Sequence, residues 1–249
     1  TVTMEVYEYR KVANLPGACQ DFEFITESLN ARNGAIDNLT LASANGNLVI
    51  EASLNNYSGN NSSPKFVSEP VRAFCVGQQF NWKQSAIDKD GDSLFFRLIE
   101  PKGGPFNQVC SSVPFTFMNG WSYSQPIRTV AGTSLNINNK TGLITFTPGF
   151  QEVDVLAIGV QEFRYDSVYN QWIEIGESTR DMQITVSPNC TPQAQMGVVL
   201  DYTASGTYVD PISGLPTIDY TCLDSSVIMN FQTKLDCSTI SADGTDFRL

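Results

Sequence analysis

Apolar and polar residues alternate over short spans along most of this chain, and apolar residues at the three- and four-residue spacing of a helix are nearly absent. Residues that favour turns recur about every ten positions. This pattern is typical of an all-β protein with the strands arranged as a β-sandwich. The strands it predicts are 4–10, 48–54, 80–84, 94–100, 143–147, 155–163, 172–177 and 182–186.

Two breaks in the alternation suggest boundaries between domains. The stretch 55–64 is rich in Asn, Ser and Gly, and the stretch after Cys190 is irregular and rich in Gly, Pro, Thr and Asp. We therefore expect tandem β-domains: a truncated N-terminal β-domain at 1–64, a central β-sandwich at 65–190, and a linker with the start of a third β-module at 191–249. The first residues lack the order of a signal peptide and the last ones resemble an interrupted strand, so the chain is expected to be a piece of a longer protein.

Composition narrows the class of partner. The 249 residues are 41% hydrophobic, which is enough to build folded cores, and the net charge is −11. Fifteen basic residues are scattered among 26 acidic ones, and nucleic acid is bound by clustered Lys and Arg. Nucleic acid is therefore not an expected partner. No apolar stretch is long enough to cross a bilayer, so no transmembrane segment is expected in this chain.

The most specific local motif is an acidic loop in front of the expected strand 94–100. Asp88, Asp90 and Asp92 stand at alternate positions, and Gly91 allows a tight backbone path between them. Three carboxylates so spaced can converge on Ca²⁺, although the order of residues is not that of an EF-hand. The alternative is a turn whose carboxylates are solvated.

A calcium shell needs six to eight oxygen atoms, so the loop must recruit ligands from elsewhere. Glu162 or Asp181, on neighbouring expected strands, are the candidates. The alternative is that these carboxylates form a cross-strand network of ion pairs with Arg164 and Arg180.

The chain has six cysteines and no histidine, so the usual mixed zinc site is excluded and disulfides are expected. Spacing alone cannot choose among the pairings. The firmest pair is Cys222 with Cys237, because they flank one short expected strand. The alternative is that some cysteines are reduced core residues. The other disulfide candidates are Cys19, Cys75, Cys110 and Cys190.

The lack of histidine also removes Ser-His-Asp and Cys-His nucleophiles, and no phosphate-binding glycine motif occurs. No catalytic site is visible, so we predict that the chain is not an enzyme. Exposed aromatic rings can instead stack on the apolar faces of sugars. Trp121 and Trp172 are the candidates for such stacking, and structural packing is the alternative for both.

Several spaced motifs occur together in the order found in large exported surface proteins of Bacteroidota. In the central region they are NSSPKF at 61–66, Cys75 with QF at 79–80, DKDGDSL at 88–94, TGLITFTP at 141–148, VQEFR at 160–164 and RDMQITV at 180–186. Further motifs at 15–38 and 227–247 resemble the modules before and after it. The chain thus resembles gliding-motility-associated proteins of the mobile cell-surface adhesin type.

The resemblance implies an Ig-like or cadherin-like, disulfide-stapled segment of a cell-surface adhesin, exported by the type IX secretion system and used in gliding motility and surface attachment. Its implied partners are neighbouring repeats of the same chain, the secretion and gliding machinery, and an extracellular surface or polysaccharide. Alternatives are a carbohydrate-binding or accessory module of an exported polysaccharide-degrading protein, or a structural stalk or filament repeat. Relatives carry cysteine where this chain has Ala31, so Cys19 has no implied partner. Ser167 fits an O-glycosylation triplet of such proteins.

Overall fold

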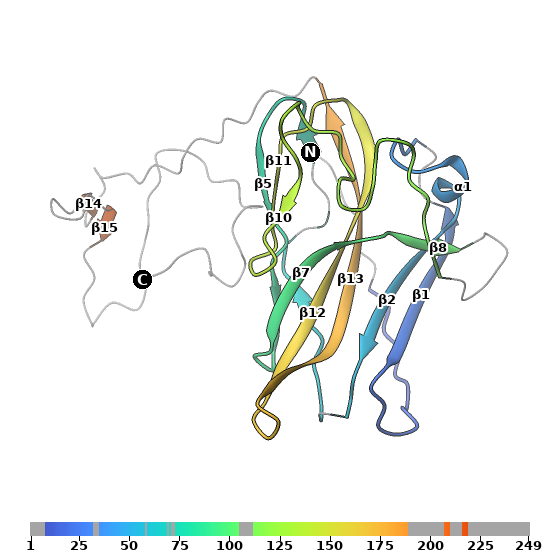
Figure 1. Cartoon of the computed structure of the whole chain (residues 1–249), viewed down its shortest axis with the longest axis vertical. Coiled ribbons are helices and arrows are strands. Elements are labelled where there is room, and N and C mark those ends of the chain that lie inside the picture. Colours follow the sequence, from blue (N-terminus) through green and yellow to red (C-terminus); the bar gives the residue numbers. More distant parts are fainter. Residues whose placement is uncertain are drawn as a thin grey trace.

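The structure is a computed structural model that describes residues 8–31, 35–57, 59–68, 70, 73–104, 112–188, 207–209 and 216–218. Nearly all regular structure in these residues is β, as the alternation predicts, and Figure 1 shows the long strands lying side by side. Helix α1 (Leu41–Ala44) is a single turn, which Thr40 caps by accepting a hydrogen bond from the Ser43 amide. In the described part of the chain, no helix has the length and apolar character needed to span a membrane.

The strands form one large sheet and several smaller ones. The large sheet has the order β7 (Ser93–Ile99), β12 (Glu152–Asp166), β13 (Gln171–Ser187), β2 (Asn47–Leu54), β8 (Lys102–Gly104) and β9 (Val113–Pro114), with β1 (Phe22–Ala31) antiparallel to β2 and β4 (Ala73–Cys75) parallel to β13. A second sheet has the order β10 (Asn136–Ile137), β11 (Leu143–Phe146) and β5 (Phe80–Lys83). The two-stranded pairs are β3 (Lys65–Phe66) with β6 (Ala86–Ile87), and β14 (Thr207–Val209) with β15 (Pro216–Ile218).

The main core lies between the large sheet and the three-stranded sheet. Alternate residues of β12 and β13 meet alternate residues of β5 and β11 there. Phe74 is fully buried at its centre, with the ring centroids of Phe80 and Phe146 each 4.9 Å away in edge-to-face contact. The buried members of this core are Phe74, Phe80, Trp82, Ile127, Leu135, Ile144, Phe146, Leu156, Ile158, Met182, Ile184 and Val186.

Strand β12 is buried on both of its faces over much of its length. Leu156 and Ile158 enter the main core, whereas Val155 on the opposite face belongs to a smaller core with Leu39 and Phe115. This double burial explains the nearly continuous apolar run in the sequence here. It also means that a charged side chain on β12 lowers the stability of the fold unless that charge is compensated.

The predicted turn at 138–142 joins β10 to β11. Gly142 has φ +67°, and a Cβ there would lie 2.5 Å from the carbonyl oxygen of Gln84, so only glycine fits. The Phe96 amide donates to the carbonyl of Asn139 at 2.7 Å. The turn is thus attached to β7, the strand that follows the acidic loop.

The predicted domain boundaries remain predictions. Strands on both sides of residue 64 pair in one sheet, because β2 pairs with β13 through Leu54 and Gly176. In the expected third module, the described residues are those of the β14–β15 hairpin.

The predicted disulfides are tested at two positions. Cys75 is disulfide-bonded, and its partner lies outside the described residues. Cys19, named as a disulfide candidate, instead has a free thiol, which donates to Asp21 at 2.8 Å. Cys110, Cys190, Cys222 and Cys237 also lie outside the described residues, so their pairing stays a prediction.

Candidate metal site

The acidic loop joins β6 to β7 and is organised by its first carboxylate. Asp88 Oδ1 accepts hydrogen bonds from the backbone amides of Asp90 at 2.9 Å and of Asp92 at 2.8 Å. Gly91 has φ +82°, the left-handed conformation that glycine adopts without strain. The side chain of Asp88 therefore folds the loop, and the glycine permits that fold as the sequence predicts.

The three predicted ligands do not all converge. Asp90 turns away from the other two, and its Oδ2 accepts the backbone N–H of Ser62 at 2.5 Å. Asp92 turns inward, where its side chain is 5% exposed. Side chains at alternate positions of a tight turn need not share a face, and of the predicted trio of Asp88, Asp90 and Asp92 the structure brings Asp88 and Asp92 together.

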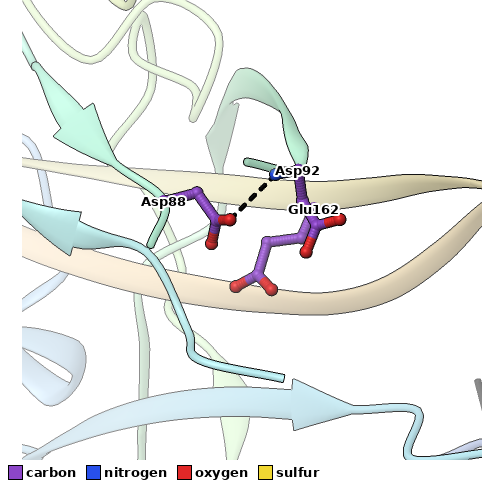
Figure 2. A group of neighbouring side chains, drawn as sticks. All are labelled: Asp88, Asp92 and Glu162. Atoms are coloured by element: carbon purple, nitrogen blue, oxygen red, sulfur yellow. Dashed lines mark hydrogen bonds between the residues drawn. The ribbon is translucent and has the colours of Figure 1, made fainter. Parts of the chain in front are cut away.

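Glu162 takes the third position instead. It lies on β12 opposite Leu94 of β7, so the register of the sheet brings its carboxylate beneath the loop. One carboxylate oxygen from each of Asp88, Asp92 and Glu162 lies within 4.8 Å of the others, and we call these three residues the acidic triad. Figure 2 shows the triad converging from the loop and from β12.

Asp181, the other predicted recruit, is elsewhere. It pairs with Ala157, five residues along β12 from Glu162, which is roughly 16 Å at the usual rise per residue. Among the described residues, the acidic triad is the one group of carboxylates with the spacing of a metal site.

Two oxygens of the triad are buried without a hydrogen-bond donor among the described residues. They are Asp88 Oδ2 and Glu162 Oε1. Glu162 is 1% exposed, and its other oxygen accepts from the side-chain amide of Asn61. Buried polar atoms are nearly always paired, so two such orphan carboxylate oxygens at one place form an arrangement that a cation could satisfy.

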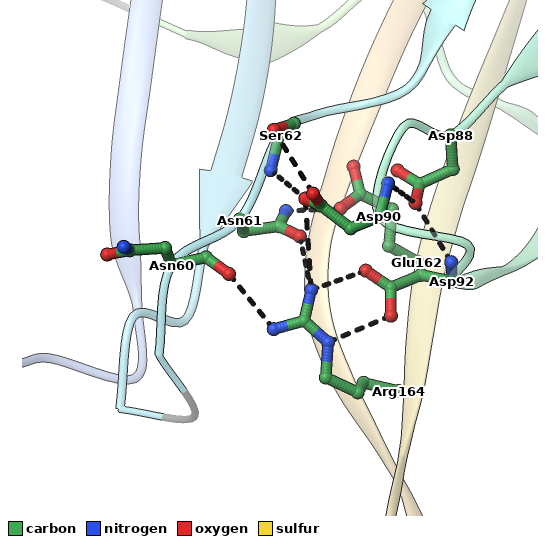
Figure 3. A network of polar contacts seen from close by, with 8 residues as sticks. All are labelled: Asn60, Asn61, Ser62, Asp88, Asp90, Asp92, Glu162 and Arg164. Carbon is green, nitrogen blue, oxygen red and sulfur yellow. Dashed lines mark hydrogen bonds and ion pairs between the residues drawn. The ribbon is translucent and has the colours of Figure 1, made fainter.

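Arg164 supplies part of the positive charge. Its Nε and Nη2 donate to the two oxygens of Asp92 at 2.9 and 2.6 Å, and its Nη1 donates to the carbonyl of Asn60 at 3.0 Å. Figure 3 shows this network spanning the acidic loop, β12 and the segment 60–62. Arg164 therefore pairs with Asp92 and, at 4.0 Å, with Asp90, whereas the predicted network joined Arg164 and Arg180 to Glu162 and Asp181.

The single positive charge of Arg164 does not balance the negative charges of the nearby carboxylates. Burial raises the pKa of Glu162 to about 7, and the neighbouring charges of Asp88 and Asp92 act in the same direction, against the Asn61 hydrogen bond and Arg164. Arg164 in turn has its pKa raised, chiefly by its hydrogen bonds to Asp92. The carboxylates thus exceed the cations, and the orphan oxygens mark where the excess lies.

A second buried acidic pair lies at the other end of β12. Glu152 accepts from the backbone amide and the Nε of Arg128, both at 2.8 Å. Asp154 is fully buried, and neither of its oxygens has a donor among the described residues. Burial first, and then the nearby Glu152, raise the pKa of Asp154 to about 9, so Asp154 holds a proton at neutral pH.

The two tryptophans that are candidates for sugar stacking lie in different surroundings. Trp121 packs beneath the guanidinium of Arg128, 4.6 Å from the ring centroid, which covers one face of the indole and favours the structural alternative. Trp172 is 60% exposed and borders a groove. Ser167 lies exposed at the tip of the β12–β13 hairpin, where O-glycosylation stays a prediction.

Sequence reasoning missed two residues of the site, Asn61 as the partner of Glu162 and Arg164 as the partner of Asp92. Asn61 stood in the motif at 61–66, and Arg164 follows Glu162 by two positions on one face of β12. No family model, no curated protein and no solved structure matches this chain.

Proposed function

We propose that this chain is a non-catalytic, Ig-like or cadherin-like segment of a bacterial surface adhesin used in attachment and gliding, and that a calcium ion held by the acidic triad stabilises it. The observation that carries the calcium site is the pair of buried orphan oxygens, Asp88 Oδ2 and Glu162 Oε1, beside the carboxylate of Asp92. The adhesin assignment rests on the order of the sequence motifs.

The donor set suits calcium. All three triad ligands are carboxylate oxygens, which are the hard ligands that Ca²⁺ prefers. Asp92 can serve both Arg164 and an ion, because each carboxylate oxygen has two lone-pair positions. Further oxygens would come from water or backbone carbonyls. Calcium tolerates such irregular shells, whereas Mg²⁺ demands a near-ideal octahedron.

An ion here would join parts of the chain that are distant in sequence. The triad connects the loop before β7 to β12, and Arg164 and Asn61 extend the network to the segment before β3. Because the unfolded chain cannot assemble this set, calcium stabilises the folded form by an amount set by its concentration relative to Kd. Calcium at a hundredfold excess over Kd adds about 2.7 kcal/mol.

The first experiment measures bound calcium and thermal melting of the oxidised protein, in EDTA and after calcium is restored. We expect one calcium ion per chain and a Tm lower in EDTA by roughly 5–11 °C, from the same stabilisation divided by the unfolding entropy of a domain of this size. Equal melting curves and no bound metal would overturn the calcium site.

Two variants locate the ion. Glu162→Gln removes a triad charge yet keeps an amide of the same size, and it should abolish the calcium-dependent shift. Asp90→Asn is the matched control, because Asp90 contacts Ser62 outside the triad, and it should keep the shift. Loss of the shift in Asp90→Asn with retention in Glu162→Gln would contradict the assignment of ligands.

The adhesin half of the proposal is tested in cells of the source organism. Antibodies raised against this segment should label intact cells, and deletion of the segment from the full-length protein should reduce attachment to glass. Labelling only after the cells are broken would overturn the surface location, whatever the calcium measurements give.

A further inference from the structure

A groove of about 700 Å³ lies beside β7, the strand at the end of the large sheet. Its lining includes three aromatic side chains, those of Phe95, Phe163 and Trp172, which we call the aromatic wall, and two lysines, Lys83 and Lys140. Its size lies within the range of small-molecule and oligomer binding sites. The proposed calcium site does not include any of these residues.

The aromatic wall offers a flat apolar surface to solvent. Trp172 is 60% exposed and Phe95 is 37% exposed. The ring of Tyr165 packs edge-on against Trp172, with centroids 5.4 Å apart, and the Tyr165 hydroxyl donates to Asn170. One side of the Trp172 indole therefore packs against Tyr165, which is itself hydrogen-bonded to Asn170. Most of the surface of the indole remains exposed.

The backbone around Lys140 is held in place by contacts with neighbouring strands. The turn that carries Lys140 is attached to β7 through the hydrogen bond from the Phe96 amide to the Asn139 carbonyl. Gly142 closes the turn tightly against the Phe96 ring and the Gln84 carbonyl. The turn is thus ordered before a ligand binds, which reduces the ordering that the ligand must impose.

The charge of the groove is opposite to that of the molecule. The whole chain has 26 acidic and 15 basic residues, yet the described residues that line the groove include two lysines and no carboxylate. The side chain of Lys140 makes no hydrogen bond or ion pair with a described residue, and it is exposed. A ligand for this groove should therefore be anionic.

We propose that this groove binds an anionic polysaccharide, with a sugar ring stacked on Trp172 and a carboxylate or sulfate group paired with Lys140. A sugar ring has an apolar face of C–H groups that suits an exposed indole, and a rim of hydroxyls that suits the side chains of Ser93 and Thr141.

The test measures binding of the full oxidised chain to soluble polymers by affinity electrophoresis, with calcium present and at two salt concentrations. Dextran sulfate and unmodified dextran share one backbone and differ in charge, and polygalacturonate separates carboxylate from sulfate as the source of that charge. We expect retardation by at least one anionic polymer, little by dextran, and weaker retardation at the higher salt concentration. A net charge of −11 opposes non-specific binding to polyanions, so retardation indicates a local site.

Variants assign the binding to the groove. Trp172→Ala should weaken binding at least tenfold, and Tyr169→Ala is its matched control, because Tyr169 is 73% exposed on the same hairpin and does not line the groove. Lys140→Gln should weaken binding severalfold, and Lys65→Gln, also exposed, should leave it unchanged. Thermal melting of each variant checks that it is folded.

Three results would each overturn the proposal: no retardation by any of the polymers, equal retardation by dextran and dextran sulfate, or unchanged binding in folded Trp172→Ala. The melting experiments on calcium do not enter this decision. Failure of the calcium site would leave the groove intact, and failure of polymer binding would leave the calcium site intact.

Discussion

Strand β12 carries two buried acidic groups, one near each end, and they are neutralised in different ways. At Glu152, Arg128 occupies both carboxylate oxygens, and the neighbouring Asp154 holds a proton. At Glu162, the arginine of the site binds Asp92 instead, and oxygens of Asp88 and Glu162 are left facing one another.

Burial and a raised pKa are therefore not what distinguishes the proposed metal site from the first group. Both Asp154 and Glu162 are buried and both have a raised pKa. Only the second group has three ligand oxygens within 4.8 Å, contributed partly by a loop that solvent can reach. The number and spacing of convergent oxygens decide whether a proton or a divalent ion is the better neutralising partner.

The largest expected effect comes from removing the arginine of the first group. Arg128→Met leaves Glu152, whose side chain is 0% exposed, without its cation, and we expect a loss of about 3–5 kcal/mol of stability in urea unfolding. Calcium should not restore it. Arg10→Met is the control, because its pair with Glu8 is exposed on both sides and should change stability by less than about 1 kcal/mol. A small effect for both variants would mean that the first group is not held by Arg128.

The second effect separates the two groups by their response to calcium. Asp154→Asn keeps the triad, so the calcium-dependent gain of about 2.7 kcal/mol at a hundredfold excess over Kd should remain. Asp88→Asn should lose that gain, because the amide that replaces the carboxylate carries no charge. The measurement is the urea midpoint with and without calcium. If Asp154→Asn abolished the calcium response, the ion would lie near Asp154, and its assignment to the acidic triad would be contradicted.

The third effect concerns pH. The pKa of Asp154 is raised from an ordinary 3.8 to about 9, so between these values the folded chain binds more protons than the unfolded chain. Stability should therefore fall as pH rises, by at most about 2 kcal/mol between pH 7 and pH 8.5. Urea unfolding in saturating calcium measures the slope. Asp154→Asn should flatten it, and a parent whose stability rises over this range would contradict the sign.

The smallest effect is on calcium affinity. Arg164→Met removes a positive charge that pairs with Asp92, so an incoming ion meets less repulsion and a freer ligand. We expect calcium to bind roughly threefold to tenfold more tightly, from the screened interaction between a single and a double charge a few ångströms apart. Isothermal titration after removal of metal measures it. Weaker binding in this variant would show that Arg164 positions Asp92 for the ion.

The sequence predicts the strands well where one pattern covers a whole strand. Phe80 and Trp82 alternate with polar residues, so β5 is evident. β13 is one strand of 17 residues, but its middle is polar and the alternation there suggests two separate strands. Arg180 explains the gap: it is partly buried, with its guanidinium 4.0 Å above the ring of Phe66, a contact that no local pattern reveals.

The sequence predicts those features of the candidate site that depend on residues adjacent in the chain. The acidic loop and the role of Gly91 follow from adjacent residues. The choice of Glu162 over Asp181 depends on the register between β7 and β12, and the loss of Asp90 depends on the approach of Ser62. Both are properties of the folded sheet, which is why the sequence predicts Asp90 alongside Asp88 and Asp92, and Glu162 as one of two further candidates.

The order of strands also determines how the sheet responds to a pulling force. β1 runs antiparallel to β2, and β2 runs antiparallel to β13, so β1 and β13 point in the same direction. A force that enters at Phe22 and leaves at Ser187 therefore pulls along the strands, across hydrogen bonds that lie perpendicular to it. The ladder bonds between these strands are then loaded together in shear, whereas a sheet pulled open from one end loses its bonds one at a time.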